Sequence, residues 1–355
     1  MILKECFTDE FISSRAGTSI EKKKIYEKVV HAFYLLEKLA NTNLYFIFKG
    51  GTSLMLLLKE FNRFSVDIDT LMKKEMQDKI DEIVFSFKDE ILIDVVEDKR
   101  KPVDIIKRHF KFFYNSIYPS QNENEKPYVL LDIVFDDMEY ASLESLNIDS
   151  HFVKTDNPYQ KVLVPTIDEM LGDKLTAFAP KTIGILYHRP NERFSKHVEI
   201  IKQLYDISKL YDSMKNIELV RKTYNEIALI QIRNRGLDIT LENTLKDTIE
   251  ACAAIITQNK NKIISVEDYD QIKKGYEGFK HYTVNIFRQQ ELLTMASKAY
   301  ILAINVLYEE ELREEEKPIN TFVGRQWKYI KQNIGVDLYN KLMQACFIFN
   351  KYSIK

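Results

Sequence analysis

The sequence predicts an α/β fold: a core of strands and helices, followed by a part that is almost entirely α-helical. Up to about residue 165, apolar runs of strand length alternate with helical patterns, and from Thr166 onward apolar residues recur at helical spacing in successive segments. The 355 residues, of which 45% are hydrophobic, are enough for two domains. We therefore expect one domain over residues 1–165 and a helical domain over residues 166–355.

The predicted strands are short apolar or aromatic runs bounded by glycine and polar residues. They cover residues 44–48, 66–71, 91–96, 109–117 and 128–135, and a polar loop at 119–127 precedes the last one. The predicted helices of the second part cover residues 192–212, 216–232, 240–258, 288–315 and 336–350. A further helix carries Lys174 and starts near Thr166 or Asp168, either of which can cap it.

A glycine pair, Gly50 and Gly51, follows the first predicted strand. Glycine adopts backbone conformations that are closed to other residues, and without a Cβ atom it lets phosphate oxygens approach the backbone amides. We expect Thr52 or Ser53 to cap the next helix, whose N-terminal N–H groups and dipole favour an anion. A glycine pair alone is equally compatible with an ordinary tight turn. In this position it predicts a phosphate-binding turn.

The stretch 66–71 alternates apolar and polar residues, which places Asp67 and Asp69 on the same face of a strand. Two neighbouring carboxylates repel each other, and a divalent cation relieves that repulsion. Mg²⁺ prefers oxygen ligands of this kind and completes its octahedron with waters and phosphates. Asp-x-Asp alone is more typical of a solvated strand, but its position after the glycine turn favours a metal site. Arg63 and Ser65 precede it and can position phosphate or orient a carboxylate, although an arginine before a strand is commonly a surface residue.

Asp132 stands in the middle of the apolar run 128–135. A buried carboxylate is costly without a partner, so we expect a metal, a basic side chain or backbone donors beside it. As a third acid with Asp67 and Asp69 it can help to hold Mg²⁺, with Mn²⁺ as the alternative ion, and activate a hydroxyl nucleophile. A purely structural buried acid is the other interpretation.

In this order, the glycine pair, the Asp-x-Asp and the later strand aspartate resemble the DNA polymerase β-like nucleotidyltransferase superfamily. The fuller strings at 49–54 and 63–69 are similar to its AbiEii/AbiGii branch, the toxins of bacterial abortive-infection and toxin–antitoxin systems. Residues 168–177 resemble the lysine helix of that family, and residues 202–207 its Arg-Asp-x-Tyr-Asp-Leu helix. The resemblance covers roughly residues 25–210. It implies an α/β (α+β) nucleotidyltransferase core with a mixed sheet, followed by a mostly α-helical C-terminal domain.

The resemblance also implies roles for individual residues. Asp67, Asp69 and Asp132 would bind the metal, Lys174 would contact the triphosphate, and Asp206 would be the last polar residue of the cleft. The residues expected to bind the nucleotide are Gly50, Gly51, Thr52, Ser53, Arg63, Ser65 and Lys174. This chain departs from the family pattern at Lys202, where arginine is usual, and at Gln203, where aspartate is usual. The implied substrate is an NTP, the acceptor can be the 3′ end of tRNA, and the implied protein partner is a cognate antitoxin.

Charge and composition narrow the function classes further. A net charge of −2 argues against a protein that coats nucleic acid nonspecifically, but it leaves room for a local basic groove. Candidate basic clusters lie at 99–101, at 107–109 and between Lys181 and His197, although each taken singly is more typical of a solvated surface. The aromatic segment 276–282 can stack a base or belong to the core.

The remaining observations concern location and incidental residues. Three distant cysteines form neither a zinc pattern nor an obvious disulfide framework, so we expect a reducing compartment. The sequence shows no apolar run of membrane-spanning length and no signal peptide, so we expect a cytoplasmic protein that does not bind membranes. Its six histidines, His109 among them, show no metal-ligand spacing, and we expect them to be incidental.

Two function classes follow from the sequence. The first is an NTP-dependent nucleotidyltransferase that acts on a hydroxyl, with RNA, a small molecule such as an antibiotic, or a protein as the acceptor. The second is a nucleotide- or protein-binding module that has kept the fold without turnover, which the departure at Gln203 would favour. Transfer of label from an NTP to an acceptor distinguishes the two.

Overall fold

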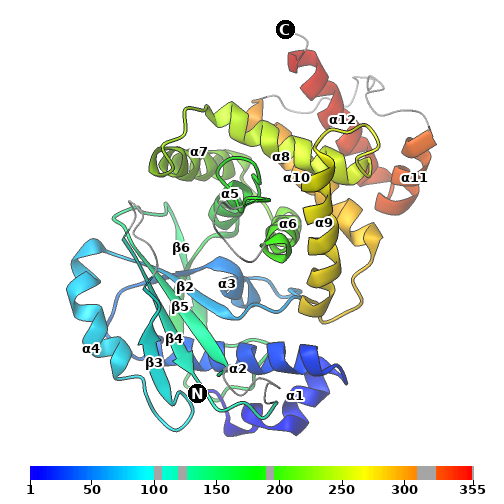
Figure 1. Ribbon diagram of the computed structural model, residues 1–355. Coiled ribbons are helices and arrows are strands. Elements are labelled where there is room, and N and C mark those ends of the chain that lie inside the picture. Colours follow the sequence, from blue (N-terminus) through cyan, green and yellow to red (C-terminus); the bar gives the residue numbers. More distant parts are fainter. Residues whose placement is uncertain (100–105, 119–125, 189–195, 310–324, 354–355) are drawn as a thin grey trace. The chain divides into compact units, whose positions relative to one another are not determined.

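The computed structural model describes residues 1–99, 106–118, 126–188, 196–309 and 325–353 (Figure 1). The chain divides into two compact units. We call the first the sheet unit; it contains Met1–Thr166 together with His281–Asn285. We call the second the helical unit; it contains Ile167–Lys280 and Ile286–Lys355.

A mixed sheet of seven strands forms the centre of the sheet unit, in the order β3-β4-β5-β2-β1-β7-β6. Parallel pairing joins β2 to β5 and β1 to β7, and the other neighbours are antiparallel. The strands are β1 (Ile47–Lys49), β2 (Asp67–Met72), β3 (Asp94–Glu97), β4 (Ile106–Phe113), β5 (Tyr128–Phe135), β6 (Leu143–Asn147) and β7 (Lys161–Pro165). The predicted mixed α/β core is therefore confirmed.

Apolar residues on alternate strand positions bury one face of this sheet. On β5, Leu131 and Ile133 are fully buried, whereas Asp132 between them is partly exposed. Helix α2 packs against β5 and β2, and its residues Val29 and Phe33 are also fully buried. The helical segments of this unit are α1 (Asp9–Ala16), α2 (Ile20–Ala40), α3 (Gly50–Leu57) and α4 (Ile80–Phe85), with short 3₁₀ turns at Lys4–Phe7 and Lys74–Lys79. The opposite face carries polar side chains at its middle and a smaller apolar cluster beside them, which includes Ile47 and Leu71.

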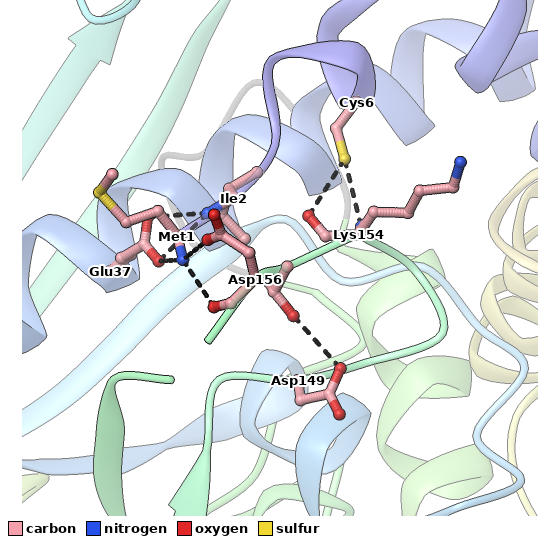
Figure 2. A network of polar contacts seen from close by, with 8 residues as sticks. Met1, Ile2, Cys6, Glu37, Asp149, Lys154 and Asp156 are labelled. Carbon is pink, nitrogen blue, oxygen red and sulfur yellow. Dashed lines mark hydrogen bonds and ion pairs between the residues drawn. The ribbon is translucent and has the colours of Figure 1, made fainter. Parts of the chain in front are cut away.

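A polar network fixes the N-terminal segment to the rest of the sheet unit (Figure 2). The Met1 amino group forms ion pairs with Asp156 and, at 3.6 Å, with Glu37 of α2. The Ile2 backbone N–H also donates to the Glu37 carboxylate, at 3.1 and 3.2 Å to its two oxygens. The Cys6 thiol lies 3.5 Å from the carbonyl oxygen of Lys154. Because Glu37 is only 5% exposed, these contacts tie the chain start to the end of α2.

The helical unit is built around α10, which packs against α6, α8 and α12. Small residues on α10, Ala296, Ala299 and Ala303, are fully buried and allow the neighbouring helices to approach closely. The helices are α5 (Ile167–Ala177), α6 (His197–Tyr211), α7 (Ile217–Asn234), α8 (Leu241–Ile256), α9 (Val266–Phe279), α10 (Gln289–Leu307), α11 (Arg325–Ile334) and α12 (Val336–Ser353), with a 3₁₀ turn η3 at Lys280–Tyr282. The mostly helical second part is confirmed.

Several details of the second part differ from the sequence prediction. Helices α9 and α11 were not predicted, and the predicted helices at 192–212 and 288–315 run partly through residues outside the described ranges. Asp168 lies within the first turn of α5, and its carboxylate accepts a hydrogen bond from the backbone N–H of Lys215 at 2.9 Å. In the part of the chain that the structure describes, no helix is both long enough and apolar enough to cross a bilayer. Cys6, Cys252 and Cys346 are buried thiols that form no disulfide bond.

One buried acid of the helical unit predicts how stability depends on pH. Asp247 of α8 is 5% exposed, and its Oδ2 accepts from the backbone N–H groups of Lys181 and Thr182 at 2.8 and 2.9 Å. Burial raises the pKa of Asp247 from 3.8 to about 6. Its folded pKa thus lies above its unfolded value, so the folded protein binds the proton more tightly between about pH 4 and 6. This contribution to stability is present at low pH and is lost as the pH rises through about 6.

We expect Asp247→Asn to raise the free energy of unfolding relative to the wild type, and to do so by more at pH 7.5 than at pH 4. The amide imitates the protonated acid, so the stability difference between variant and wild type should grow by about 2 kcal/mol across this range, at about 1.4 kcal/mol per pKa unit. Urea unfolding at both pH values measures it. The control is Asp212→Asn at a side chain that is 52% exposed. A difference for Asp247→Asn that does not change with pH would contradict the prediction.

Candidate functional site

Four residues line up across the middle of the polar sheet face. Lys49 of β1 lies opposite Asp69 of β2, Asp69 lies opposite Asp132 of β5, and Asp132 lies opposite His109 of β4. Residues that are directly opposite on neighbouring strands project to the same face, so the four side chains share one surface. Asp67, two residues before Asp69, faces the same way and is exposed. The register therefore brings the three predicted acids together on one face of the sheet.

Asp132 is paired with a histidine. The Nδ1 atom of His109 lies 2.6 Å from Oδ1 of Asp132, and the two side chains are 12% and 25% exposed. Asp132 thus has the basic partner that we expected beside it. The expectation that His109 is incidental was wrong, because the pairing arises from strand register and not from spacing along the chain. A histidine held this closely orients the carboxylate.

Gly50 and Gly51 allow close contacts that no other residue would permit. Gly50 has a φ of +78°, and a Cβ atom built on it would lie 1.9 Å from Oδ2 of Asp69. A Cβ atom on Gly51 would lie 2.4 Å from Nη2 of Arg63 and 2.6 Å from Oγ of Ser65. The Asp69 carboxylate therefore lies directly against the glycine backbone, and Arg63 and Ser65 lie over the next residue.

The hydroxyl side chains after the glycine pair do not cap the helix. Helix α3 already begins at Gly50, and its N-cap, Lys49, makes no side-chain capping bond. Thr52 Oγ1 donates instead to the carbonyl oxygen of Asp67 at 2.6 Å, and Ser53 Oγ donates to the carbonyl oxygen of Gly50 at 2.9 Å. The prediction that Thr52 or Ser53 is the cap was wrong because the helix starts earlier. The Thr52 bond ties α3 to the start of β2.

Arg63 is a buried residue of the site and not a surface arginine. It is 2% exposed, its guanidinium carbon lies 5.1 Å from the centre of the Phe61 ring, and its Nη1 donates to the carbonyl oxygen of Phe64 at 3.0 Å. Its backbone forms an antiparallel bridge with Thr283 of the segment 281–285. These contacts hold the guanidinium in place beside Gly51.

Lys174 and Asp206 form a buried ion pair in the helical unit. Nζ of Lys174 on α5 lies 3.1 Å from Oδ2 of Asp206 on α6, and the side chains are 9% and 0% exposed. The same ammonium donates to Oε1 of Gln203 at 3.2 Å. The helical unit thus brings together the two residues that the resemblance placed in one site, and Gln203 contacts Lys174 despite its departure from the family pattern.

The polar face fits a divalent cation that takes some of its ligands from a substrate. Within the described residues, no group of three or more histidine, cysteine, aspartate or glutamate side chains is arranged as a ready metal cage. Asp69 and Asp132 are nevertheless opposed across two strands, and Asp67 shares their face. Mg²⁺ is usually held by one or two carboxylates, with phosphates and waters completing its shell. The donor set suits such an ion.

Several members of the basic clusters found in the sequence form ion pairs. Arg108 binds Asp81 and Glu97, whereas Lys181 pairs with Glu250 at 3.1 Å. His188 lies 3.1 Å from Asp268. Arg100, Lys101, Arg189 and Arg193 of these clusters lie outside the described residues. These clusters therefore provide no evidence for a nucleic-acid groove.

Gly50→Ala is expected to displace Asp69 and to lower nucleotidyl transfer strongly. A side chain at positive φ costs about 1–2 kcal/mol of stability, and the new methyl group would overlap the Asp69 carboxylate. Gly17→Ala is a matched control, because Gly17 also has positive φ, +73°, but nothing within 4 Å of a new Cβ atom. Unfolding curves and transfer assays on both variants separate backbone strain from loss of the site. Equal activity of the two variants would contradict the prediction.

Comparison with known proteins adds a family match. A family model described as "Nucleotidyl transferase AbiEii toxin, Type IV TA system" matches residues 34–280. Among solved structures, the chain is similar to JHP933 from Helicobacter pylori, with a TM-score of 0.40, 15% identity, and coverage of 79% of this chain and 90% of that one. A second crystal structure from H. pylori has a TM-score of 0.40, 16% identity, and coverage of 79% and 93%. No curated protein sequence matches the chain.

Proposed function

Because the chain belongs to the AbiEii nucleotidyltransferase toxin family of type IV toxin–antitoxin systems, we propose that it transfers a nucleoside monophosphate from an NTP to a hydroxyl acceptor. The observation that carries this proposal is the placement of Asp69. Its carboxylate lies against the backbone of Gly50. On the other side of β2, Asp69 lies opposite Asp132 of the neighbouring strand β5. A phosphate bound at the glycine turn would therefore meet the carboxylates directly.

In the reaction, the acceptor oxygen forms a bond to the α-phosphorus of the NTP. The bond between that phosphorus and the bridging oxygen breaks, and pyrophosphate leaves. Asp132 takes up the proton of the acceptor hydroxyl, and His109, 2.6 Å away, holds the Asp132 carboxylate in position. Asp67, Asp69 and Asp132 would hold Mg²⁺ or Mn²⁺, which would offset phosphate charge and make the hydroxyl easier to deprotonate.

The phosphate groups have two kinds of partner in this proposal. The first backbone N–H groups of α3, at Gly50 and Gly51, would donate to a phosphate, and the helix dipole favours negative charge there. Arg63 is fixed behind Gly51 and adds a positive charge. The family pattern assigns the triphosphate to Lys174 as well, and the ion pair with Asp206 holds the Lys174 ammonium in a defined place.

The acceptor class and the partner complete the proposal. The 3′ end of tRNA is the acceptor that the family resemblance suggests, and blocking it would stop translation. Family membership implies a cognate antitoxin as the protein partner. Incubating the purified chain with each labelled NTP, Mg²⁺ and total RNA tests the activity. Label in RNA supports the proposal; label in a protein or small molecule changes the acceptor class, and no label in any acceptor indicates a binding module.

Expression of the wild-type chain in a bacterium is expected to slow growth, and Asp67→Ala is expected to relieve the arrest. The reason is that growth stops only if catalysis consumes an essential acceptor. Growth curves at matched expression levels measure the effect, with the exposed acid variant Asp94→Ala as control (53% exposed side chain). Arrest that persists in Asp67→Ala would indicate sequestration by binding instead.

A further inference from the structure

A cavity of about 890 Å³ opens in the sheet unit beside the acids. Its wall includes Val66, the residue before Asp67, and the residues of β4 and β5 that lie toward the Tyr128 end of β5. The residues that matter for its chemistry are Lys24, Lys28, Lys111, Lys126, Tyr128 and Tyr282. Its size is within the range of cavities that hold organic ligands, about 300–1,000 Å³.

Positive charge dominates this cavity. The Nζ atoms of Lys28 and Lys111 lie 5.3 and 5.1 Å from the centre of the Tyr128 ring. The Lys111 ammonium also pairs with Asp98, at 3.2 Å from Nζ to Oδ1. For Lys28, contact with the aromatic face holds the ammonium group in place while leaving its charge available. Burial lowers the pKa of Lys28, so an anionic ligand would stabilise its charged form.

Glu27 is the acid among the cavity-lining residues, and its carboxylate is already engaged. One Glu27 oxygen accepts from the hydroxyl of Ser116 and the other accepts from the backbone N–H of Ile117, at 2.8 Å for the latter. Four lysines line the cavity, and one of them, Lys111, pairs with Asp98, so the charge of the lining still favours an anion and repels a cationic acceptor. The aromatic rings add surfaces that suit planar bases.

The position of the cavity matches the acceptor side of the reaction. In the sheet order, β1 and the glycine turn that follows it lie on one side of β2, whereas β5 and β4 lie on the other side. The cavity is lined by β4 and β5, and Asp67 and Asp69 stand on β2 between it and the turn. In phosphoryl-type transfer, the attacking and leaving oxygens are roughly in line. With the leaving pyrophosphate at the turn, the acceptor enters from the cavity side.

Tyr282 comes from the segment 281–285, which is built into the sheet unit. The backbone N–H of Phe64 donates to the carbonyl oxygen of Tyr282 at 2.7 Å, and that of Val284 donates to Asn62 at 3.0 Å. The Lys22 ammonium donates to the carbonyl oxygen of Thr283 at 2.7 Å. The aromatic segment 276–282 therefore has two roles: Phe279 is fully buried, and Tyr282 lines the cavity.

We infer that this cavity binds the unpaired end of a polynucleotide acceptor, with the lysines on its phosphodiesters and the rings against its bases. As an assignment of the acceptor this rests on the proposed function, but the binding itself requires no catalysis. The cavity would accept a single-stranded nucleic acid and reject a cationic small molecule, because its lysines would repel the cation.

The test is binding of a fluorescently labelled single-stranded RNA of mixed sequence to the full chain, without NTP or metal. Tyr282→Leu is expected to weaken binding about tenfold, since stacking on an aromatic ring contributes this much per base. Lys24→Gln and Lys111→Gln should each make binding less salt-dependent, by about 0.7 in the slope of log K against log salt for one lost phosphate contact. Lys74→Gln and Tyr45→Leu, at exposed positions away from the cavity, are the matched controls and should bind like the wild type.

Two results would overturn the inference. One is wild-type RNA affinity in all three cavity variants. The other is loss of NTP affinity in those variants with RNA affinity intact, which would assign the cavity to the incoming nucleotide. Asp69→Ala keeps the two proposals apart, because it should bind RNA while failing to transfer. RNA binding that depends on the cavity in a wild-type chain without transfer activity would refute the proposed function and leave this inference standing.

Discussion

Asp69→Ala is expected to lower the rate of nucleotidyl transfer by about 10³-fold or more. Asp69 occupies the centre of the polar row, opposite Asp132 and against the backbone of Gly50. Its carboxylate is therefore the group that a bound cation and the phosphates of the NTP would share. Stabilisation of transition-state charge by such a cation contributes several kcal/mol, and about 1.4 kcal/mol changes a rate tenfold.

The variant should remain folded. Asp69 is partly exposed, and removing it relieves repulsion with Asp67 on the same face. Single-turnover transfer from a labelled NTP, together with a urea unfolding curve, separates the two effects. Asp94→Ala on the edge strand β3 is the control, because that aspartate pairs with Lys88 at the surface and lies outside the row. Wild-type turnover in Asp69→Ala would remove the proposed mechanism.

The strands of the core were predictable where alternation is strong. Strand β5 was predicted at its observed limits, because its apolar residues at every second position leave only one arrangement with a buried face. Strand β1 was predicted too long: Tyr45 is 51% exposed, and pairing begins only at Ile47. An apolar run shows that a segment is buried, but its hydrogen-bonded limits depend on its neighbours.

Helix α9 shows why part of the helical unit was missed. Its buried residues are Ile272, Gly275 and Phe279, so its apolar stripe is thin. Gly275 lowers helix propensity, yet a Cβ atom there would lie 2.3 Å from the carbonyl oxygen of His197. Gly275 permits the close approach of α9 to α6. From the sequence alone, this glycine indicates only a weaker helix.

The site residues that are neighbours in the sequence could be predicted. Those that are brought together only by the pairing register of separate strands could not. Alternation places His109 and Lys111 on the face opposite Phe110 and Phe112, a signal that could have identified both as polar-face residues. The partner of His109 nevertheless depends on how β4 pairs with β5. Lys24 and Lys28 come from α2, Lys111 from β4 and Lys126 from the segment before β5, so their convergence on one cavity depends on the fold and not on a single run of charge.

Lys174→Ala is expected to destabilise the protein by about 3–5 kcal/mol, the usual cost of removing one partner of a buried ion pair. The Asp206 carboxylate is 0% exposed and would lose the ammonium 3.1 Å away. A lysine at the surface would behave differently. Lys246→Ala, at a side chain that is 41% exposed and paired with Glu242, should change stability by no more than about 0.5 kcal/mol. Chemical unfolding of both variants measures this difference.

A loss of activity in Lys174→Ala alone would not show that the lysine contacts the triphosphate, because a weakened fold also lowers activity. The double variant Lys174→Met/Asp206→Leu resolves this, since apolar replacement of a whole buried pair is often neutral or stabilising. We expect it to regain most of the lost stability and none of the lost transfer. If transfer returns together with stability, the pair only joins α5 to α6. If stability returns without transfer, the charged Lys174–Asp206 pair is needed for the reaction itself.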